Sequence, residues 1–332
     1  MTTDIDIHAL FEQVSSGDRI ALGRAITLVE SRKPVHRSQA NQLLDLCLRK
    51  STETFRFAIS GAPGAGKSTL IEVLGQHIVD SGENLAVLTV DPTSRITSGA
   101  ILGDKTRMPA LSVNPSVFIR PTAAGDALGG VADATREAIV LCEAAGYQNI
   151  CIETVGVGQS EVTARSMTDF LLLLVMPGGG DDLQGIKRGI VEIADAIAVN
   201  KADGDQLETA MATRQNYMQA AHFFAPKEHG IQTRVVNCSA LENTGIEALW
   251  SIMQDFNVKV TKSSFLEGQR RKQDVTWLEG KVDLLVRDII QSNNQLNTLY
   301  ESLKIKVEAR QLSVSTAFDD LSRAIHSNFD IS

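Results

Sequence analysis

One run of eight residues has the composition and spacing of a phosphate-binding loop. The run is Gly61, Ala62, Pro63, Gly64, Ala65, Gly66, Lys67 and Ser68, it fits the pattern G-x-x-x-x-G-K-[S/T], and Thr69 follows it. Glycines let the backbone N–H groups of such a loop converge on phosphate oxygens. The Lys67 ammonium would bridge the β- and γ-phosphates, and the Ser68 hydroxyl would bind Mg²⁺. We therefore predict that residues 61–69 bind a nucleoside triphosphate and that Lys67 also acts in catalysis.

A second motif indicates which base is bound. Asn200, Lys201, Ala202 and Asp203 fit the pattern N-K-x-D and follow an apolar segment. A carboxylate at Asp203 can accept hydrogen bonds from the ring N–H and the exocyclic amine of guanine, whereas adenine would leave it unpaired. Ser239, Ala240 and Leu241 match a loop whose backbone contacts the guanine carbonyl. A polar turn is the alternative for the first motif alone, but the three motifs together predict GTP rather than ATP.

Three acidic residues are candidates for the magnesium environment. Asp91 and Glu153 each follow an apolar, strand-like segment, and Asp104 lies in a long polar stretch. Mg²⁺ prefers oxygen ligands and keeps several waters, so carboxylates near Ser68 could hold it directly or through water. The alternative for Asp91 and Glu153 is a helix N-cap or a surface acid. We predict Ser68, Asp91, Asp104 and Glu153 as metal-site residues, and Glu153 also as catalytic.

Two glycine-rich segments are predicted to act as switches. Residues 153–159 combine Glu153 with two glycines, and Gln159 could position the attacking water or form a hydrogen bond at the rim. Residues 178–187 contain three successive glycines, which packing alone does not justify because each adds to the entropic cost of ordering. After the phosphate loop and residues 153–159, residues 178–187 form a third loop, which we expect to be mobile and functional.

The elements that must position these residues alternate between strands and helices from about residue 55 to residue 253. Short apolar runs end at the motifs described above, and amphipathic helical segments separate them. This order predicts an α/β fold with a mostly parallel sheet, helices on both faces, and ligands beyond the carboxyl ends of the strands. We assign residues 1–50 to an N-terminal helical extension, 51–261 to a P-loop GTPase domain and 262–332 to a C-terminal helical arm.

The arm carries a heptad-like apolar seam. Its members are Val275, Leu278, Val282, Leu285, Ile289, Leu296, Leu299 and Leu303. Gly280 and residues 292–294 predict breaks, so a helical hairpin is expected more than one rod. The seam could pack on the core of its own chain or join two chains.

Composition narrows the possible functions. The net charge of −8 argues against an electrostatic nucleic-acid surface. The four cysteines are scattered and are expected to be buried, reduced thiols. The N-terminus lacks the pattern of a signal peptide, and the most apolar run, residues 170–176, is too short to cross a membrane. These features predict a cytoplasmic protein.

From about residue 20 to residue 277 the chain resembles the MeaB/ArgK/MMAA family of P-loop GTPases. The matching stretches are the phosphate loop, VDPTS at 90–94, ILGDKTRM at 101–108, ETVGVGQSE at 153–161, GGDDLQGIK at 179–187 and NKADGD at 200–205. The glycine-rich stretch at 179–187 makes the resemblance specific, because it is unusual among GTPases. One departure is residues 122–130, TAAGDALGG, where the family usually has a stretch richer in serine.

The resemblance implies a metallochaperone-type GTPase that assists an adenosylcobalamin-dependent acyl-CoA mutase, chiefly methylmalonyl-CoA mutase. It implies GTP and Mg²⁺ as ligands, a homodimer joined by the C-terminal arm, and Asp91, Asp104 and Glu153 beside Ser68 at the metal. It also places Asp182 and Lys187 in a mutase-coupled switch, where we count them as catalytic candidates. The alternatives are a nickel-enzyme maturation GTPase, which normally needs His- or Cys-rich metal sites, and a protein kinase of a periplasmic transport system.

Overall fold

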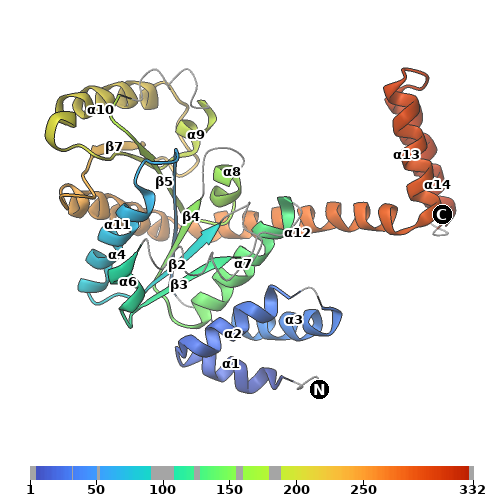
Figure 1. Ribbon diagram of the computed structural model, residues 1–332, viewed down its shortest axis with the longest axis horizontal. Helices are drawn as coiled ribbons and strands as arrows, with labels where there is room; N and C mark the ends of the chain where they lie inside the picture. Colours follow the sequence, from blue (N-terminus) through green and yellow to red (C-terminus); the bar gives the residue numbers. More distant parts are fainter. Residues whose placement is uncertain are drawn as a thin grey trace. The chain divides into compact units, whose positions relative to one another are not determined.

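The computed structural model describes residues 5–31, 33–50, 53–90, 108–122, 128–154, 160–178 and 188–328. Within these ranges the strands are β1 (Phe55–Gly61), β2 (Leu85–Val90), β3 (Val117–Thr122), β4 (Asn149–Thr154), β5 (Phe170–Val175), β6 (Ala196–Val199) and β7 (Arg234–Asn237). They form one seven-stranded sheet in the order β3-β2-β4-β1-β5-β6-β7 (Figure 1), and every pairing is parallel. The predicted α/β class with a parallel sheet is confirmed.

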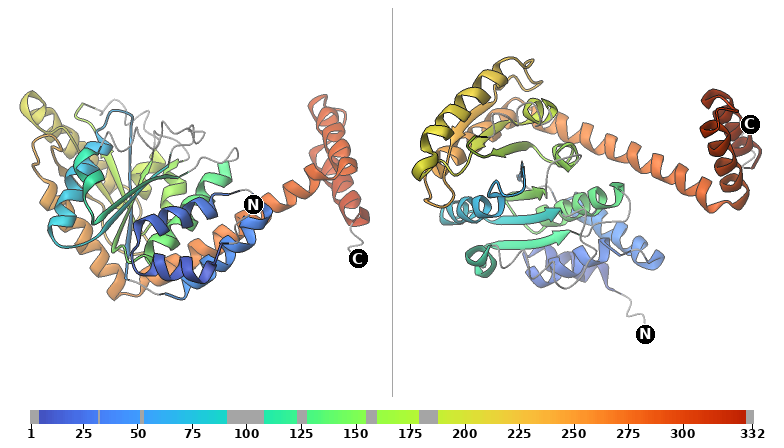
Figure 2. Two further views of the ribbon diagram at one scale, coloured as in Figure 1. Left: turned by 60° about the horizontal axis from the view of Figure 1, so that its bottom comes forward. Right: turned by 45° about the horizontal axis from the view of Figure 1, so that its top comes forward.

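Helices connect the strands and cover both faces of the sheet (Figure 2). One face is covered by α4 (Lys67–Asp80), α6 (Pro109–Val113) and α11 (Ile246–Lys262). The other is covered by α7 (Leu128–Ala144), α8 (Ser160–Arg165), α9 (Arg188–Ile193) and α10 (Leu207–His222), with the 3₁₀ turn η2 (Gly204–Gln206) before α10. In β1, Phe57 and Ile59 pack on the first face and Ala58 on the second, as the two-residue period of a strand requires.

Three N-terminal helices extend the second face: α1 (Ile7–Ser15), α2 (Arg19–Val29) and α3 (Pro34–Leu48). Their buried apolar side chains share one core with α7, which explains why this stretch carries helical periodicity without a chemical motif. Asp6 and Asp18 begin α1 and α2 as N-caps, each accepting backbone N–H hydrogen bonds. A proline can end a helix or begin one: α2 ends at Val29, and Pro34 is the first residue of α3, where its missing N–H costs nothing.

The chain forms two compact units, Met1–Arg271 and Lys272–Ser332. The long helix α12 (Phe265–Ser292) runs through this boundary and is followed by α13 (Asn294–Glu308) and α14 (Val314–Asn328). The break predicted at Gly280 is wrong, because α12 continues through it; a helix accepts an interior glycine at a cost of about 1 kcal/mol. The break at residues 292–294 is correct: Asn293 caps α13 by accepting from the N–H groups of Gln295 and Leu296. The predicted domain boundaries at residues 50 and 261 stay predictions.

All four cysteines are buried free thiols, as expected. Burial raises the pKa of the Cys47 thiol to about 11, although nearby Lys50 lowers it in part, so this thiol is protonated at neutral pH. Among the described residues, none of the helices has the length and apolarity that a membrane crossing requires.

Candidate functional site

The predicted phosphate loop joins the centre of the sheet to a helix N-terminus. β1 ends at Gly61, and α4 begins at Lys67. Gly64 and Gly66 have φ of 80° and 91°, in the left-handed region that side chains disfavour. The loop can therefore turn its backbone N–H groups toward the N-terminus of α4, which is the arrangement that attracts an anion.

Lys67 is held inside this loop. Its Nζ donates to the carbonyl oxygens of Gly61 at 2.9 Å and Ala62 at 3.2 Å, and the side chain is buried. A buried ammonium ion is costly unless it is hydrogen bonded, so these carbonyls keep its charge at the loop. The ammonium is thus positioned where phosphate oxygens of a bound nucleotide would lie.

Ser68, in the first turn of α4, meets Glu153, near the end of β4. β4 pairs directly with β1, with Glu153 opposite Ile59, and the Ser68 hydroxyl donates to Glu153 Oε1 at 2.7 Å. The next residue on β4, Thr154, donates to the Ser60 hydroxyl at 3.0 Å and holds the two strand ends together. A hydroxyl and a carboxylate side by side are a donor set that suits Mg²⁺, so these two predicted metal residues fit the ion.

Asn200 connects the phosphate loop with the predicted base-binding loops. Its Nδ2 donates to the Ala65 carbonyl at 2.8 Å, and its Oδ1 accepts from the Ala240 N–H at 3.0 Å. The fit is close, since a side chain on Gly66 would place its Cβ 2.5 Å from the same Nδ2. Asn200 is buried, so one amide ties together three segments that the sequence separates widely.

Asp203, the predicted acceptor for the base, is hydrogen bonded to the loop that begins at Ser239. The Ser239 hydroxyl donates to Asp203 Oδ2, and the Ala202 N–H donates to the Cys238 carbonyl at 3.0 Å. Lys201 has a φ of 59°, a left-handed conformation that is strained for a residue with a side chain and is typical of functional loops. Leu241 is 82% exposed, so its side chain is open to solvent beside this loop.

The structure therefore brings together the described members of the predicted site. Residues 61–69 and Glu153 gather at the phosphate end, and Asn200, Asp203, Ser239 and Ala240 gather at the base end. Asp91, Asp104, Gln159, Asp182 and Lys187 lie outside the described residues. Their predicted roles at the metal, at the attacking water and in the third loop stay predictions.

The structure shows two features near the site that the sequence analysis did not predict. One is the Gly178 N–H, which donates to Thr213 Oγ1 at 3.0 Å and so fixes the chain just after β5. The other is the Asn200 brace, meaning the hydrogen bonds of its side chain with Ala65 and Ala240; the sequence indicates only the place of Asn200 in the base motif. The motif N-K-x-D signals the residue, but its bond to Ala65 depends on two segments that are 135 residues apart.

A third missed feature is a buried ionic cluster around Asp195. This carboxylate accepts from Arg165 Nη1 at 3.0 Å and the Leu171 N–H at 2.8 Å, and it lies 3.1 Å from His229 Nε2 and 3.6 Å from Lys227 Nζ. Burial by itself raises the pKa of this carboxyl, but the charge of Arg165 and the surrounding hydrogen bonds hold it below its ordinary value of 3.8. The pair of Arg165 and Asp195 therefore connects the end of α8 with the segment just after α9.

The fold and the joined phosphate and base loops define a P-loop GTPase. A sequence model described as methylmalonyl Co-A mutase-associated GTPase MeaB matches residues 22–295, and the chain belongs to the MeaB family.

Relatives and a solved structure are similar over nearly the whole chain. GTPase ArgK of Escherichia coli (strain K12) is 40% identical, with 99% of each chain covered. A methylmalonic aciduria type A homolog, mitochondrial, of Mus musculus is 39% identical, with 97% of this chain and 80% of the relative covered. A crystal structure described as LAO/AO transport system kinase is 34% identical, with a TM-score of 0.82 and coverage of 98% of this chain and 99% of that chain.

Proposed function

We propose that this chain hydrolyses GTP and serves as a chaperone of an adenosylcobalamin-dependent acyl-CoA mutase, with methylmalonyl-CoA mutase as the expected partner. The observation that supports the proposal is the Asn200 brace, which joins the phosphate loop to the predicted base loop, where Asp203 is our proposed acceptor for guanine. The family description and the name of the mouse relative support the choice of mutase.

The residues at the phosphate end can do most of what hydrolysis needs, because phosphoryl transfer is largely a matter of positioning and charge. Lys67 would exchange its carbonyl partners for phosphate oxygens when GTP enters. Ser68 and Glu153 would hold Mg²⁺, which supplies positive charge against the phosphates when it is bound. Gln159, Asp182 and Lys187 complete the proposed catalytic group, together with Asp91 and Asp104 at the metal.

The mutase assignment is tested by measuring GTP hydrolysis with and without saturating methylmalonyl-CoA mutase. We expect stimulation of at least about tenfold, which requires a barrier reduction of only about 1.4 kcal/mol and can come from one charge that the partner positions. Co-purification of the two proteins with a non-hydrolysable GTP analogue should exceed that with GDP. The Lys67→Ala chain gives the background rate. Unchanged hydrolysis and no co-purification with any acyl-CoA mutase would contradict the chaperone role while leaving GTP hydrolysis itself testable.

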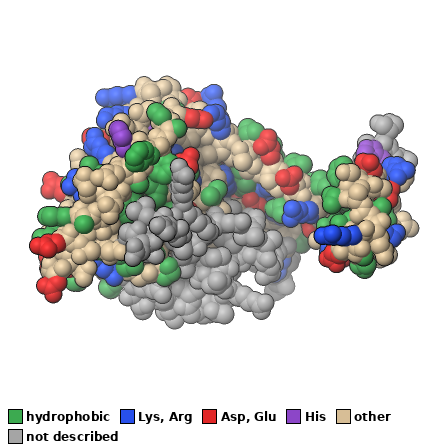
Figure 3. Space-filling model, turned by 90° about the horizontal axis from the view of Figure 1, so that it is seen from above, with side chains coloured by type: hydrophobic (Ala, Val, Ile, Leu, Met, Phe, Trp, Pro, Cys, Tyr) green, Lys and Arg blue, Asp and Glu red, His purple; other side chains and the backbone are tan. Residues whose placement is uncertain are grey.

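A homodimer joined by the C-terminal arm is also part of the proposal. Apolar residues recur at intervals of three and four along α12, which places them on one side of the helix. Figure 3 shows hydrophobic side chains at the surface among charged ones. Val275, Leu278, Val282 and Leu285 are 57%, 64%, 50% and 58% exposed. By contrast, Leu296 and Leu303 of the predicted seam are buried in α13. A helix with such an exposed stripe gains stability by packing it against a second helix, which a second copy of the chain would supply.

We predict that Leu278→Asp with Leu285→Asp gives a monomer, because two charges would face the partner in the stripe. Light scattering of the purified chain measures the result, and calorimetry should show unchanged GTP binding. Thr276→Asp with Gln291→Asp is the matched control, since it adds the same two charges at exposed positions on the opposite side of α12. A dimer that survives the first pair of changes, or dissociates equally with the second, would show that the stripe does not join the chains.

A further inference from the structure

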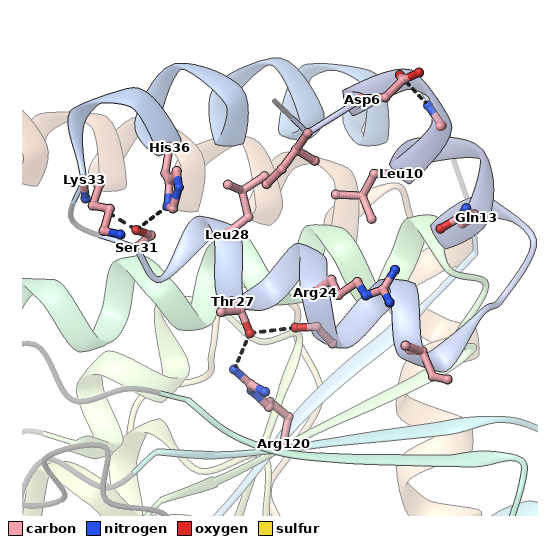
Figure 4. Close-up of a pocket in the computed structure, with 14 residues that line it drawn as sticks. Asp6, Leu10, Gln13, Arg24, Thr27, Leu28, Ser31, Lys33, His36 and Arg120 are labelled. Carbon is pink, nitrogen blue, oxygen red and sulfur yellow. Dashed lines mark hydrogen bonds between the residues drawn. The ribbon is translucent and has the colours of Figure 1, made fainter. Parts of the chain in front are cut away.

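A pocket of about 830 Å³ lies among the N-terminal helices, away from the phosphate and base loops. Figure 4 shows its walls: residues of α1 and α2, the start of α3, and Arg120 of β3. One face of α2, continued by the residue two positions after the helix ends, lines the pocket with Ile20, Gly23, Arg24, Thr27, Leu28 and Ser31. This volume is in the range of small-molecule sites, and none of the lining residues belongs to the proposed GTPase machinery.

Gly23 gives the first indication that the space has a use. It lies inside α2, where glycine disfavours the helix, and a Cβ built on it meets no atom within 4 Å. The interior glycine of α4 differs, because a Cβ on Gly75 would lie 2.6 Å from Leu111 and 2.9 Å from Leu85. Packing therefore explains Gly75 but not Gly23. A ligand that needs the open wall would explain it.

The charges of the pocket indicate what kind of ligand fits. Arg24 and Lys33 line it, and within the described residues neither side chain has an ion pair or hydrogen bond. Arg120 donates through Nη2 to Glu30 at 2.7 Å and to Thr27 at 3.2 Å, while its buried Nε has no partner among the described residues. The pocket is thus cationic in a chain whose net charge is −8.

The remaining wall is apolar. Leu10 and Leu28 are buried beneath the pocket, and Ile20 at its edge is 70% exposed. Asp6 lines the pocket too, but its carboxylate is engaged as the N-cap of α1, where it accepts from the Ala9 N–H at 3.0 Å. An apolar wall beside unpaired cations suits a molecule with an aliphatic body and an acidic head.

We propose that this pocket binds a small amphipathic anion, with its aliphatic body on Leu10, Ile20 and Leu28 and its carboxylate or phosphate head at Arg24. Lys33, at the opposite end of the pocket (Figure 4), adds positive charge from a longer distance. The site is independent of the proposed GTPase function, and it requires no movement of the phosphate loop. Filling the wall at Gly23 should block the body of the ligand, whereas removing the cations should affect only the head.

The experiment uses the full chain and the fluorescent anion 8-anilinonaphthalene-1-sulfonate, displaced by octanoate, octyl phosphate or neutral 1-octanol. We expect one saturable site per chain from which octanoate displaces the dye at least tenfold more effectively than octanol does. Comparison of octanoate with octyl phosphate identifies the preferred head. Gly23→Leu should weaken octanoate and octanol alike, by tenfold or more, and Arg24→Gln with Lys33→Gln should weaken only the two anions.

Two controls separate binding from folding. Gly23→Ala adds a single methyl group to the same wall, and Arg49→Gln removes an exposed cation of the N-terminal helices that does not line the pocket; both should bind as the parent does. Thermal unfolding checks that every variant is folded. Two results would overturn the proposal: octanoate fails to displace the dye, or a folded Gly23→Leu chain binds the dye and octanoate as the parent does. Either result would place the binding elsewhere, for instance on the exposed stripe of α12.

Discussion

Asp203→Asn should exchange the preference of the chain from GTP to xanthosine triphosphate. The carboxylate accepts two hydrogen bonds from guanine, whereas an amide offers a donor that matches the extra carbonyl of xanthine. The Ser239 hydroxyl can still donate to the remaining side-chain oxygen, so the loop should keep its conformation. Losing a charge-assisted pair costs about 1.5–3 kcal/mol, which corresponds to about 10- to 150-fold weaker GTP binding.

Titration calorimetry with both nucleotides measures this change. Asp205→Asn is the matched control, because it removes the same charge from an exposed carboxylate two residues further along the chain. It should bind GTP as the parent does. If GTP binds the Asp203→Asn chain with undiminished affinity, the base site lies elsewhere and the guanine assignment fails.

Asp195→Asn should destabilise the folded chain by about 3–5 kcal/mol, the usual cost of removing one partner from a buried ionic group. The side chain is fully buried, and the change would remove the negative charge that lies 3.0 Å from Arg165 Nη1 and 3.6 Å from Lys227 Nζ. The amide oxygen can still accept from the Leu171 N–H, so the expected loss is electrostatic more than steric. Urea unfolding of the two chains gives the difference in free energy of unfolding.

The control for this change is Asp255→Asn, which breaks the exposed pair of Asp255 with Arg234 and should cost at most about 1 kcal/mol. Equal losses in the two variants would contradict the importance of burial. The pH dependence has a definite sign. Because the folded-state pKa of Asp195 is below 3.8, its stabilising contribution is complete above that value and is lost as the pH falls through the lower, folded-state pKa.

Most of the fold could be predicted because its signals are local. Each strand contains a short apolar stretch, and the helices between the strands have their own periodicity, so the α/β class required no long-range information. The two helix boundaries that the sequence did not predict correctly also have local causes. Gly280 has a low helix propensity, yet its neighbours favour helix on both sides and α12 continues. Pro34 is compatible with either a helix end or a first helical turn, and the sequence alone did not decide between them.

The residues of the candidate site could be predicted from motifs and strand ends, but the contacts between distant segments could not. The phosphate loop and the N-K-x-D motif each lie in one short segment, so spacing alone indicated them. The contact of Ser68 with Glu153 depends on β4 pairing with β1, which the sequence order does not reveal. The Asp195 cluster draws its charged members from α8, the end of α9 and the loop before β7, none of which has a motif.

The brace made by Asn200 also has a consequence for how binding energies combine. A single side chain is hydrogen bonded to the loop that would hold the phosphates and to the loop that would hold the base. Ordering either loop therefore restricts Asn200 and lowers the entropy cost of ordering the other. Linkage requires such a coupling to be reciprocal, so that base and phosphates strengthen each other's binding by the same factor. The affinity for a whole nucleotide would then exceed the sum expected from its separate parts.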